Sequence, residues 1–163
     1  MSRYRPPAPK KSPYITSEGM RTLEQEQKSL WSRRREVVAA LSAAAAEGDR
    51  SENAEYIYHK KELRELDRRI RYLQKRLPDL NVIDTKPNNP EKVYFAATVH
   101  LEDEDEIVKI YRIVGPDEFD HKDHYISVDS PLARGLLKRK LGEEVSIETP
   151  GGISHYIIIA IEY

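Results

Sequence analysis

The chain has 163 residues, of which 34% are charged and 39% hydrophobic, and its net charge at pH 7 is −1. This composition is typical of a soluble protein with a large solvated surface. No apolar run approaches the ~20 residues that span a bilayer, and no apolar stretch follows the basic N-terminus as a signal peptide requires. The absence of cysteine excludes disulfides and thiolate metal sites, and we expect a cytoplasmic protein.

The small net charge hides a segregation of charge along the chain. Residues 1–77 contain 18 Lys and Arg against 11 Asp and Glu, whereas residues 78–163 contain 9 against 17. The two halves therefore carry net charges of +7 and −8. Such a division predicts two parts that face different partners.

The N-terminal segment is rich in proline and basic residues. MSRYRPPAPKKSP contains four prolines and four basic residues, with almost nothing to bury. Residues 1–14 are therefore predicted to form a disordered basic tail.

A long amphipathic helix is predicted next. Thr16 precedes it as an N-cap, and Glu18 lies in the first turn, where the helix dipole favours an anion. Apolar residues then recur at heptad a and d positions until Gly48 ends the pattern. They are Met20, Leu23, Leu30, Val37 and Leu41.

A second heptad pattern follows almost at once and stops at Pro78. Its a positions are Tyr56, Leu63, Ile70 and Leu77, and its d positions are His59, Leu66 and Leu73. Two helices of about 40–45 Å that are joined by so short a turn must fold back on each other. Residues 15–80 are therefore predicted to form a protruding antiparallel coiled-coil hairpin with EGDRSEN at its tip.

The pattern changes to that of a β domain after residue 80. Residues 81–92 are rich in Asn and Pro and are predicted to be a linker. Residues 93–163 contain five strand-like segments and one short helix, PLARGLLKRK. The expected fold class is α+β, in which a two-helix hairpin precedes a domain with a mostly antiparallel sheet.

The second predicted helix carries a basic stripe on one face. Lys60, Arg64, Arg68, Arg71 and Lys75 recur at spacings of three and four residues, and Lys61 lies beside them. The ordinary alternative is a solvated face whose cations pair with acids one turn away. Because the stripe itself contains no acid, we expect it to bind the phosphate backbone of a nucleic acid, largely independently of sequence.

Three carboxylates lie three residues apart at the tip: Asp49, Glu52 and Glu55. One interpretation is helix capping, with Asp49 or Ser51 as the N-cap and Asp49 and Glu52 as a capping box. The other is that Asp49 and Glu52 share a hard cation such as Mg²⁺. Two carboxylates make an incomplete site, so the chain alone is expected to hold no stable metal and to lend these ligands to a metal held by another molecule.

Two motifs resemble those of a known family. GDRSENAEY, followed by KKELRELDRRIRYLQKRL, resembles the bacterial Gre transcript cleavage factors, closely those of the GreB type, and DSPLARGLL resembles the second signature of that family. The likeness extends from about Ile15 to Tyr163. It implies an N-terminal coiled-coil hairpin and an FKBP-like C-terminal domain. In that family the C-terminal domain binds the rim of the RNA polymerase secondary channel, and the hairpin enters the channel.

The resemblance also implies roles for individual residues. Asp49 and Glu52 help to hold the second catalytic Mg²⁺ of the polymerase and its water, so that backtracked RNA is cut near its 3′ end. The basic face contacts this RNA through Lys60, Lys61, Arg64, Arg68, Arg71 and Lys75. Asp129, Ser130 and Pro131 fall in the polymerase-docking region. The chain itself is then not an enzyme, and we expect a monomer whose partners are bacterial RNA polymerase and nascent RNA.

Two other functions are compatible with this architecture. An FKBP-like domain also suggests a prolyl isomerase or a peptide-binding module, although that reading leaves the tip and the stripe unexplained. A regulator that binds the secondary channel without promoting cleavage is the second alternative, and the Asp49 and Glu52 pair argues against it.

Overall fold

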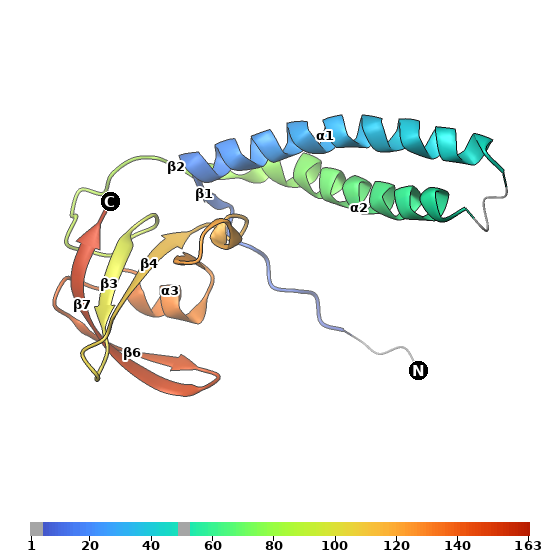
Figure 1. Ribbon diagram of the computed structural model, residues 1–163. Coiled ribbons are helices and arrows are strands. Elements are labelled where there is room, and N and C mark those ends of the chain that lie inside the picture. Colours follow the sequence, from blue (N-terminus) through green and yellow to red (C-terminus); the bar gives the residue numbers. More distant parts are fainter. Residues whose placement is uncertain (1–4, 49–52) are drawn as a thin grey trace. The chain divides into compact units, whose positions relative to one another are not determined.

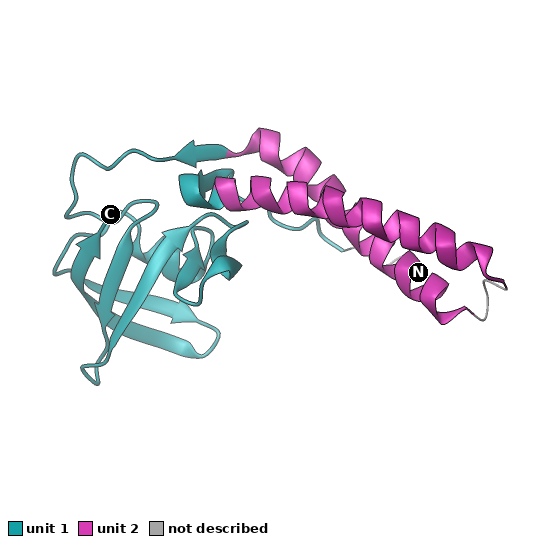
Figure 2. Cartoon of the chain, turned by 45° about the horizontal axis from the view of Figure 1, so that its top comes forward, with its two compact units in different colours: residues 1–19, 81–163 teal, residues 20–80 magenta. Residues whose placement is uncertain are grey.

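The computed structural model describes residues 5–48 and 53–163. The chain divides into two compact units, one of residues 20–80 and the other of residues 1–19 together with 81–163 (Figure 2). In the described part of the chain, no helix is both long enough and apolar enough to cross a membrane.

The unit of residues 20–80 is a hairpin of two long helices, α1 (Ser17–Ala46), whose first turn belongs to the other unit, and α2 (Ala54–Arg76) (Figure 1). The helices are antiparallel, because Glu26 near the start of α1 contacts Arg69 near the end of α2. Predicted heptad residues form the buried seam, as expected for a coiled coil. Those that are almost fully buried are Leu23, Val37, Ile70 and Leu73.

The predicted ends of the hairpin agree with the structure at two points. The backbone N–H of Gly19 donates a hydrogen bond of 3.0 Å to Oγ1 of Thr16, which confirms Thr16 as the N-cap of α1. The α2 helix ends at Arg76 and continues as a single 3₁₀ turn, η1 (Leu77–Asp79), which contains Pro78. Proline cannot donate to the helical ladder, so the α-helix stops here.

The unit of residues 1–19 and 81–163 contains a five-stranded sheet in the order β5-β4-β3-β7-β6 (Figure 1). Its strands are β3 (Thr98–Glu102), β4 (Val108–Val114), β5 (Tyr125–Ser127), β6 (Glu144–Thr149) and β7 (Gly152–Glu162). The 3₁₀ turn η2 (Phe119–His121) precedes β5, and the short helix α3 (Pro131–Leu136) follows it. Ala133 and Leu136 of α3 belong to the buried core of the sheet.

The sheet is mostly antiparallel, as predicted, but one of its edge strands is parallel to its neighbour. Strand β5 lies parallel to β4, with Ile113 opposite Ile126, while the other pairs are antiparallel. Residues 115–124 and their turn η2 separate the two strands. A connection of that length can cross over and return in the same direction, which a tight hairpin turn cannot do.

A second, two-stranded sheet joins the boundary between the predicted tail and hairpin to the start of the predicted linker. Strand β1 (Tyr14–Thr16) pairs in parallel with β2 (Asn81–Ile83). The backbone N–H of Asn81 also donates a hydrogen bond of 2.7 Å to the carbonyl of Pro13. The structure therefore differs from the predicted boundaries at residues 14 and 81, because the two segments satisfy each other's backbone groups.

Candidate functional site: hairpin tip, basic face and docking helix

Asn53 is the residue that begins the second helix at the tip end of the hairpin. Its Oδ1 accepts a hydrogen bond of 3.1 Å from the N–H of Tyr56, and its Nδ2 donates one of 2.8 Å to the carbonyl of Ala44 in α1. One side chain therefore caps α2 and ties it to the last turn of α1. The prediction that Asp49 or Ser51 caps the helix is wrong, because both residues precede the cap.

The two carboxylates proposed to bind a metal, Asp49 and Glu52, lie outside the described residues. Glu55 is described, and it lies exposed in the first turn of α2. Within residues 5–48 and 53–163, no group of three His, Cys, Asp or Glu side chains could hold a metal ion. The N-cap of α2 is Asn53, so the N-cap position itself is filled by neither of these acids.

Arginine–carboxylate pairs cross between the two helices. Arg33 of α1 contacts Glu62 of α2 through two hydrogen bonds of 2.7 and 3.2 Å, and these bonds lower the pKa of Glu62 below its ordinary value. Nε of Arg34 lies 2.7 Å from Oδ1 of Asp67. Two of the acids on α2 are therefore paired with arginines of α1.

The basic face of α2 consists of six exposed residues. They are Lys60, Lys61, Arg64, Arg68, Arg71 and Lys75. None of the six pairs with a carboxylate in the part of the chain that the structure describes. Lys60 lies over the ring of Tyr56 at 5.6 Å, and Nε of Arg71 donates to the carbonyl of Asp67. If this were an ordinary solvated face, its cations would pair with acids one helical turn away. The described residues contain no such pairs.

The predicted docking residues lie at the start of α3. The hydroxyl of Ser130 accepts a hydrogen bond of 3.2 Å from the N–H of Ala133, so Ser130 is the N-cap, and Pro131 is the first helical residue. The carboxylate of Asp129 accepts hydrogen bonds from both the backbone N–H, at 2.9 Å, and the hydroxyl of Ser12. The N-terminal segment thus contacts the predicted docking loop, which the sequence analysis did not anticipate.

A buried carboxylate, Glu118, was also missed. Its side chain is 1% exposed and accepts hydrogen bonds from the N–H of Thr16 at 2.7 Å, the hydroxyl of Thr16, and the N–H of Gly115 at 3.2 Å. A Cβ at Gly19 would lie 2.5 Å from Oε1 of Glu118, so glycine is required there. Glu118 therefore fixes the N-cap of α1 to the loop that follows β4. No local pattern around GPDEF signals this contact.

Two family models together match nearly the whole chain. The family described as "Transcription elongation factor, N-terminal" matches residues 13–82, and "Transcription elongation factor, GreA/GreB, C-term" matches residues 87–163. The chain belongs to the GreA/GreB family of transcription elongation factors. It is 54% identical to transcription elongation factor GreB of Pseudomonas aeruginosa, over 100% of this chain and 98% of that protein.

A second curated relative is also a GreB protein. The identity to GreB of Xanthomonas axonopodis pv. citri is 53%, again over 100% of this chain and 98% of that protein. Among solved structures, the Gfh1 protein of Thermus thermophilus aligns with 24% identity over 92% of this chain and 98% of that chain, with a TM-score of 0.42. The family matches confirm the predicted resemblance to GreB-type Gre factors, while the roles of individual site residues stay predictions.

Proposed function

We propose that this GreB-type elongation factor stimulates the Mg²⁺-dependent cleavage of backtracked RNA by bacterial RNA polymerase and cuts no RNA by itself. The observation that carries the proposal is the basic face of α2. Its six cations lack carboxylate partners among the described residues, while two acids of the same helix pair with α1. A row of uncompensated cations costs self-repulsion unless a polyanion neutralises it, and backtracked RNA is such a polyanion. A factor with this role works in the cytoplasm.

The hairpin has the dimensions that such a role requires. The 30 residues of α1 extend about 45 Å at 1.5 Å per residue. The hairpin is only two helices wide, and arginine–carboxylate pairs between the helices stabilise it along its length. We infer that such a narrow rod can reach the active site through the secondary channel of the polymerase.

Asp49 and Glu52 are proposed to act at the tip. Carboxylate oxygens are the ligands that Mg²⁺ prefers, and the polymerase supplies the ligands that two carboxylates leave missing. The metal, when bound, contributes the activation of a water for phosphodiester hydrolysis. The N-cap position of α2 is occupied by Asn53, which supports a role other than N-cap for these two acids. Asp129, Ser130 and Pro131 are proposed to contact the polymerase from the start of α3.

The proposal is tested with stalled, backtracked elongation complexes that carry 3′-labelled RNA. Addition of the factor should accelerate cleavage at least tenfold over the intrinsic rate of the polymerase, which corresponds to about 1.4 kcal/mol of transition-state stabilisation. The factor with Mg²⁺ and the same RNA, without polymerase, should give no product. Cutting by the factor alone, or binding to polymerase without acceleration, would contradict the proposal.

A further inference from the structure

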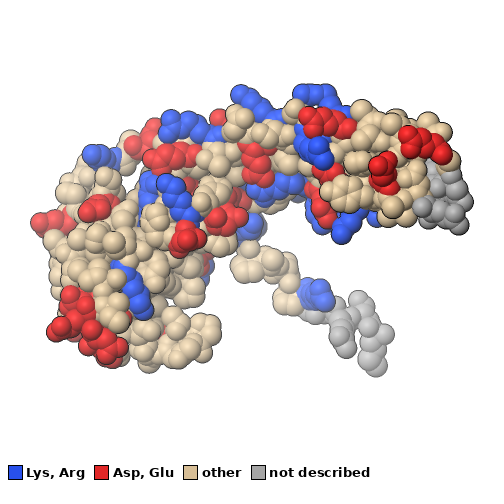
Figure 3. Space-filling model, viewed as in Figure 1, with Lys and Arg blue, Asp and Glu red and all other residues tan. Residues whose placement is uncertain are grey.

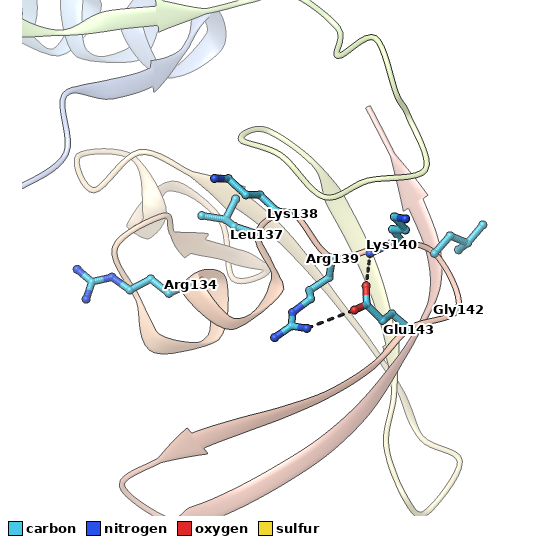
Figure 4. Close-up of a pocket in the computed structure, with 8 residues that line it drawn as sticks. Arg134, Leu137, Lys138, Arg139, Lys140, Gly142 and Glu143 are labelled. Carbon is cyan, nitrogen blue, oxygen red and sulfur yellow. Dashed lines mark hydrogen bonds and ion pairs between the residues drawn. The ribbon is translucent and has the colours of Figure 1, made fainter.

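The loop between α3 and β6 forms a basic hollow on the C-terminal unit. The hollow has a volume of about 670 Å³ and is lined by Arg134, Lys138, Arg139, Lys140, Leu141 and neighbouring residues (Figure 4). Backbone hydrogen bonds hold this loop in place. The N–H of Lys138 donates to the carbonyl of Val93 at 2.7 Å, and that of Leu141 to the carbonyl of Glu91 at 2.8 Å. The loop is therefore a fixed platform for its side chains.

The charge of this hollow is largely uncompensated. Arg139 pairs with Glu143 at 3.2 Å, as the dashed line in Figure 4 shows. The backbone N–H of Lys140 donates a hydrogen bond of 2.7 Å to the same carboxylate of Glu143. The charged side-chain groups of Arg134, Lys138 and Lys140 are exposed and form no ion pair with a carboxylate within the described ranges of the chain. Three cations around one hollow favour an anionic partner.

The surroundings of the hollow indicate which kind of anion it receives. Four of the nine Lys and Arg of residues 78–163 lie within residues 134–140, and the rest of the unit is strongly acidic. Figure 3 shows one dense group of Asp and Glu on this unit. A long nucleic acid that extends beyond the hollow would be repelled by the acidic remainder of the unit, whereas a short acidic segment would not. Leu141, which is 46% exposed, adds an apolar surface that a phosphate backbone does not need.

We propose that the hollow binds an acidic protein segment with an aliphatic side chain, and that this segment belongs to RNA polymerase. The inference rests on the proposed function, in which the C-terminal unit docks on the polymerase. Asp129, Ser130 and Pro131 lie at the start of α3, and the hollow begins at Arg134 on the same helix. Six helical residues extend only about 9 Å, so the predicted docking residues and Arg134 lie close together along this helix.

The test measures the affinity of the full-length factor for bacterial core RNA polymerase. The chain has no cysteine, so one cysteine introduced at Ser2 carries a dye for fluorescence anisotropy. The double variant Lys138→Glu, Lys140→Glu should bind at least tenfold more weakly than wild type. The matched control Lys86→Glu, Lys122→Glu makes the same change in charge on exposed residues of the same unit and should stay within twofold.

A second probe, a single-stranded RNA 20-mer without polymerase, separates the two kinds of partner. Its affinity should be the same for the Lys138→Glu, Lys140→Glu variant and the control. Equal polymerase affinities for variant and control would overturn the inference, and so would a loss of RNA affinity specific to the variant. If wild type itself fails to bind polymerase, the proposed function fails and this inference with it.

Discussion

At the scale of single residues, Glu118 is the most buried charged group among the described residues. Its carboxylate is buried, and donors from Thr16 and Gly115 surround it. A buried charge is tolerated only when hydrogen bonds of this kind replace water. Glu118 thereby ties the N-cap of α1 to the turn after β4, two segments that are 102 residues apart in sequence.

Replacement of Glu118 by Gln should lower the free energy of unfolding of the C-terminal unit by about 2 kcal/mol, because an amide offers one acceptor where the carboxylate offers two. Urea denaturation followed by near-ultraviolet circular dichroism measures the loss. The amides of Thr16 and Gly115 should also exchange their hydrogens faster. Glu148→Gln is the matched control, since Glu148 is exposed on β6. Equal stability of the two variants would show that the buried hydrogen bonds contribute nothing.

At the scale of elements, the heptad pattern predicted the hairpin correctly, whereas its turn required tertiary information. Asp49, Ser51 and Asn53 are all good N-caps by propensity. Asn53 is used because its amide also reaches the carbonyl of Ala44, a contact between helices that no local rule contains. The same limit explains why β1 and β2 were missed. They are three-residue strands whose partners lie at opposite ends of the hairpin sequence.

The candidate site follows the same division between local and distant contacts. The basic face follows from helical spacing, so its six residues could be placed on one surface from sequence. Their lack of carboxylate partners could not be predicted from sequence. It depends on contacts between the helices, in which Arg33 and Arg34 of α1 pair with Glu62 and Asp67. The contact of Ser12 with Asp129 joins residues 117 apart and was equally invisible.

The basic face of α2 gives a prediction for the whole element. Replacement of Arg64, Arg68 and Arg71 by Ala should slow the stimulated cleavage of long backtracked RNA about tenfold, because three phosphate contacts are lost. Affinity for the polymerase and the helical content should change little, since all three side chains are exposed. The control variant replaces Arg21, Lys28 and Arg35 of α1 by Ala, and these three residues are also exposed. If both triple variants lost cleavage rate to a similar extent, the effect would come from the overall positive charge and not from the basic face.

At the scale of the whole molecule, the two units have different tasks in the proposed function. The hairpin carries the acids of the tip and the basic face, and the C-terminal unit carries the docking residues and the basic hollow. The opposite net charges of the two halves fit such a division. Variants of the hairpin are then expected to change the maximal cleavage rate, whereas variants of the docking surface change the concentration of factor required.

The central claim is that the tip acids hold a metal for the polymerase, and the double variant Asp49→Asn, Glu52→Gln tests it most directly. Both changes keep the shape of the side chains and remove the charge that Mg²⁺ needs. The measurement is the cleavage rate of backtracked complexes at saturating factor, with polymerase binding checked by competition against wild type. If the tip acids hold the metal, the double variant should compete for polymerase as well as wild type does. Its cleavage rate should be at least tenfold lower, which corresponds to about 1.4 kcal/mol of transition-state stabilisation, and raised Mg²⁺ should restore part of it. A near-normal cleavage rate would contradict this claim.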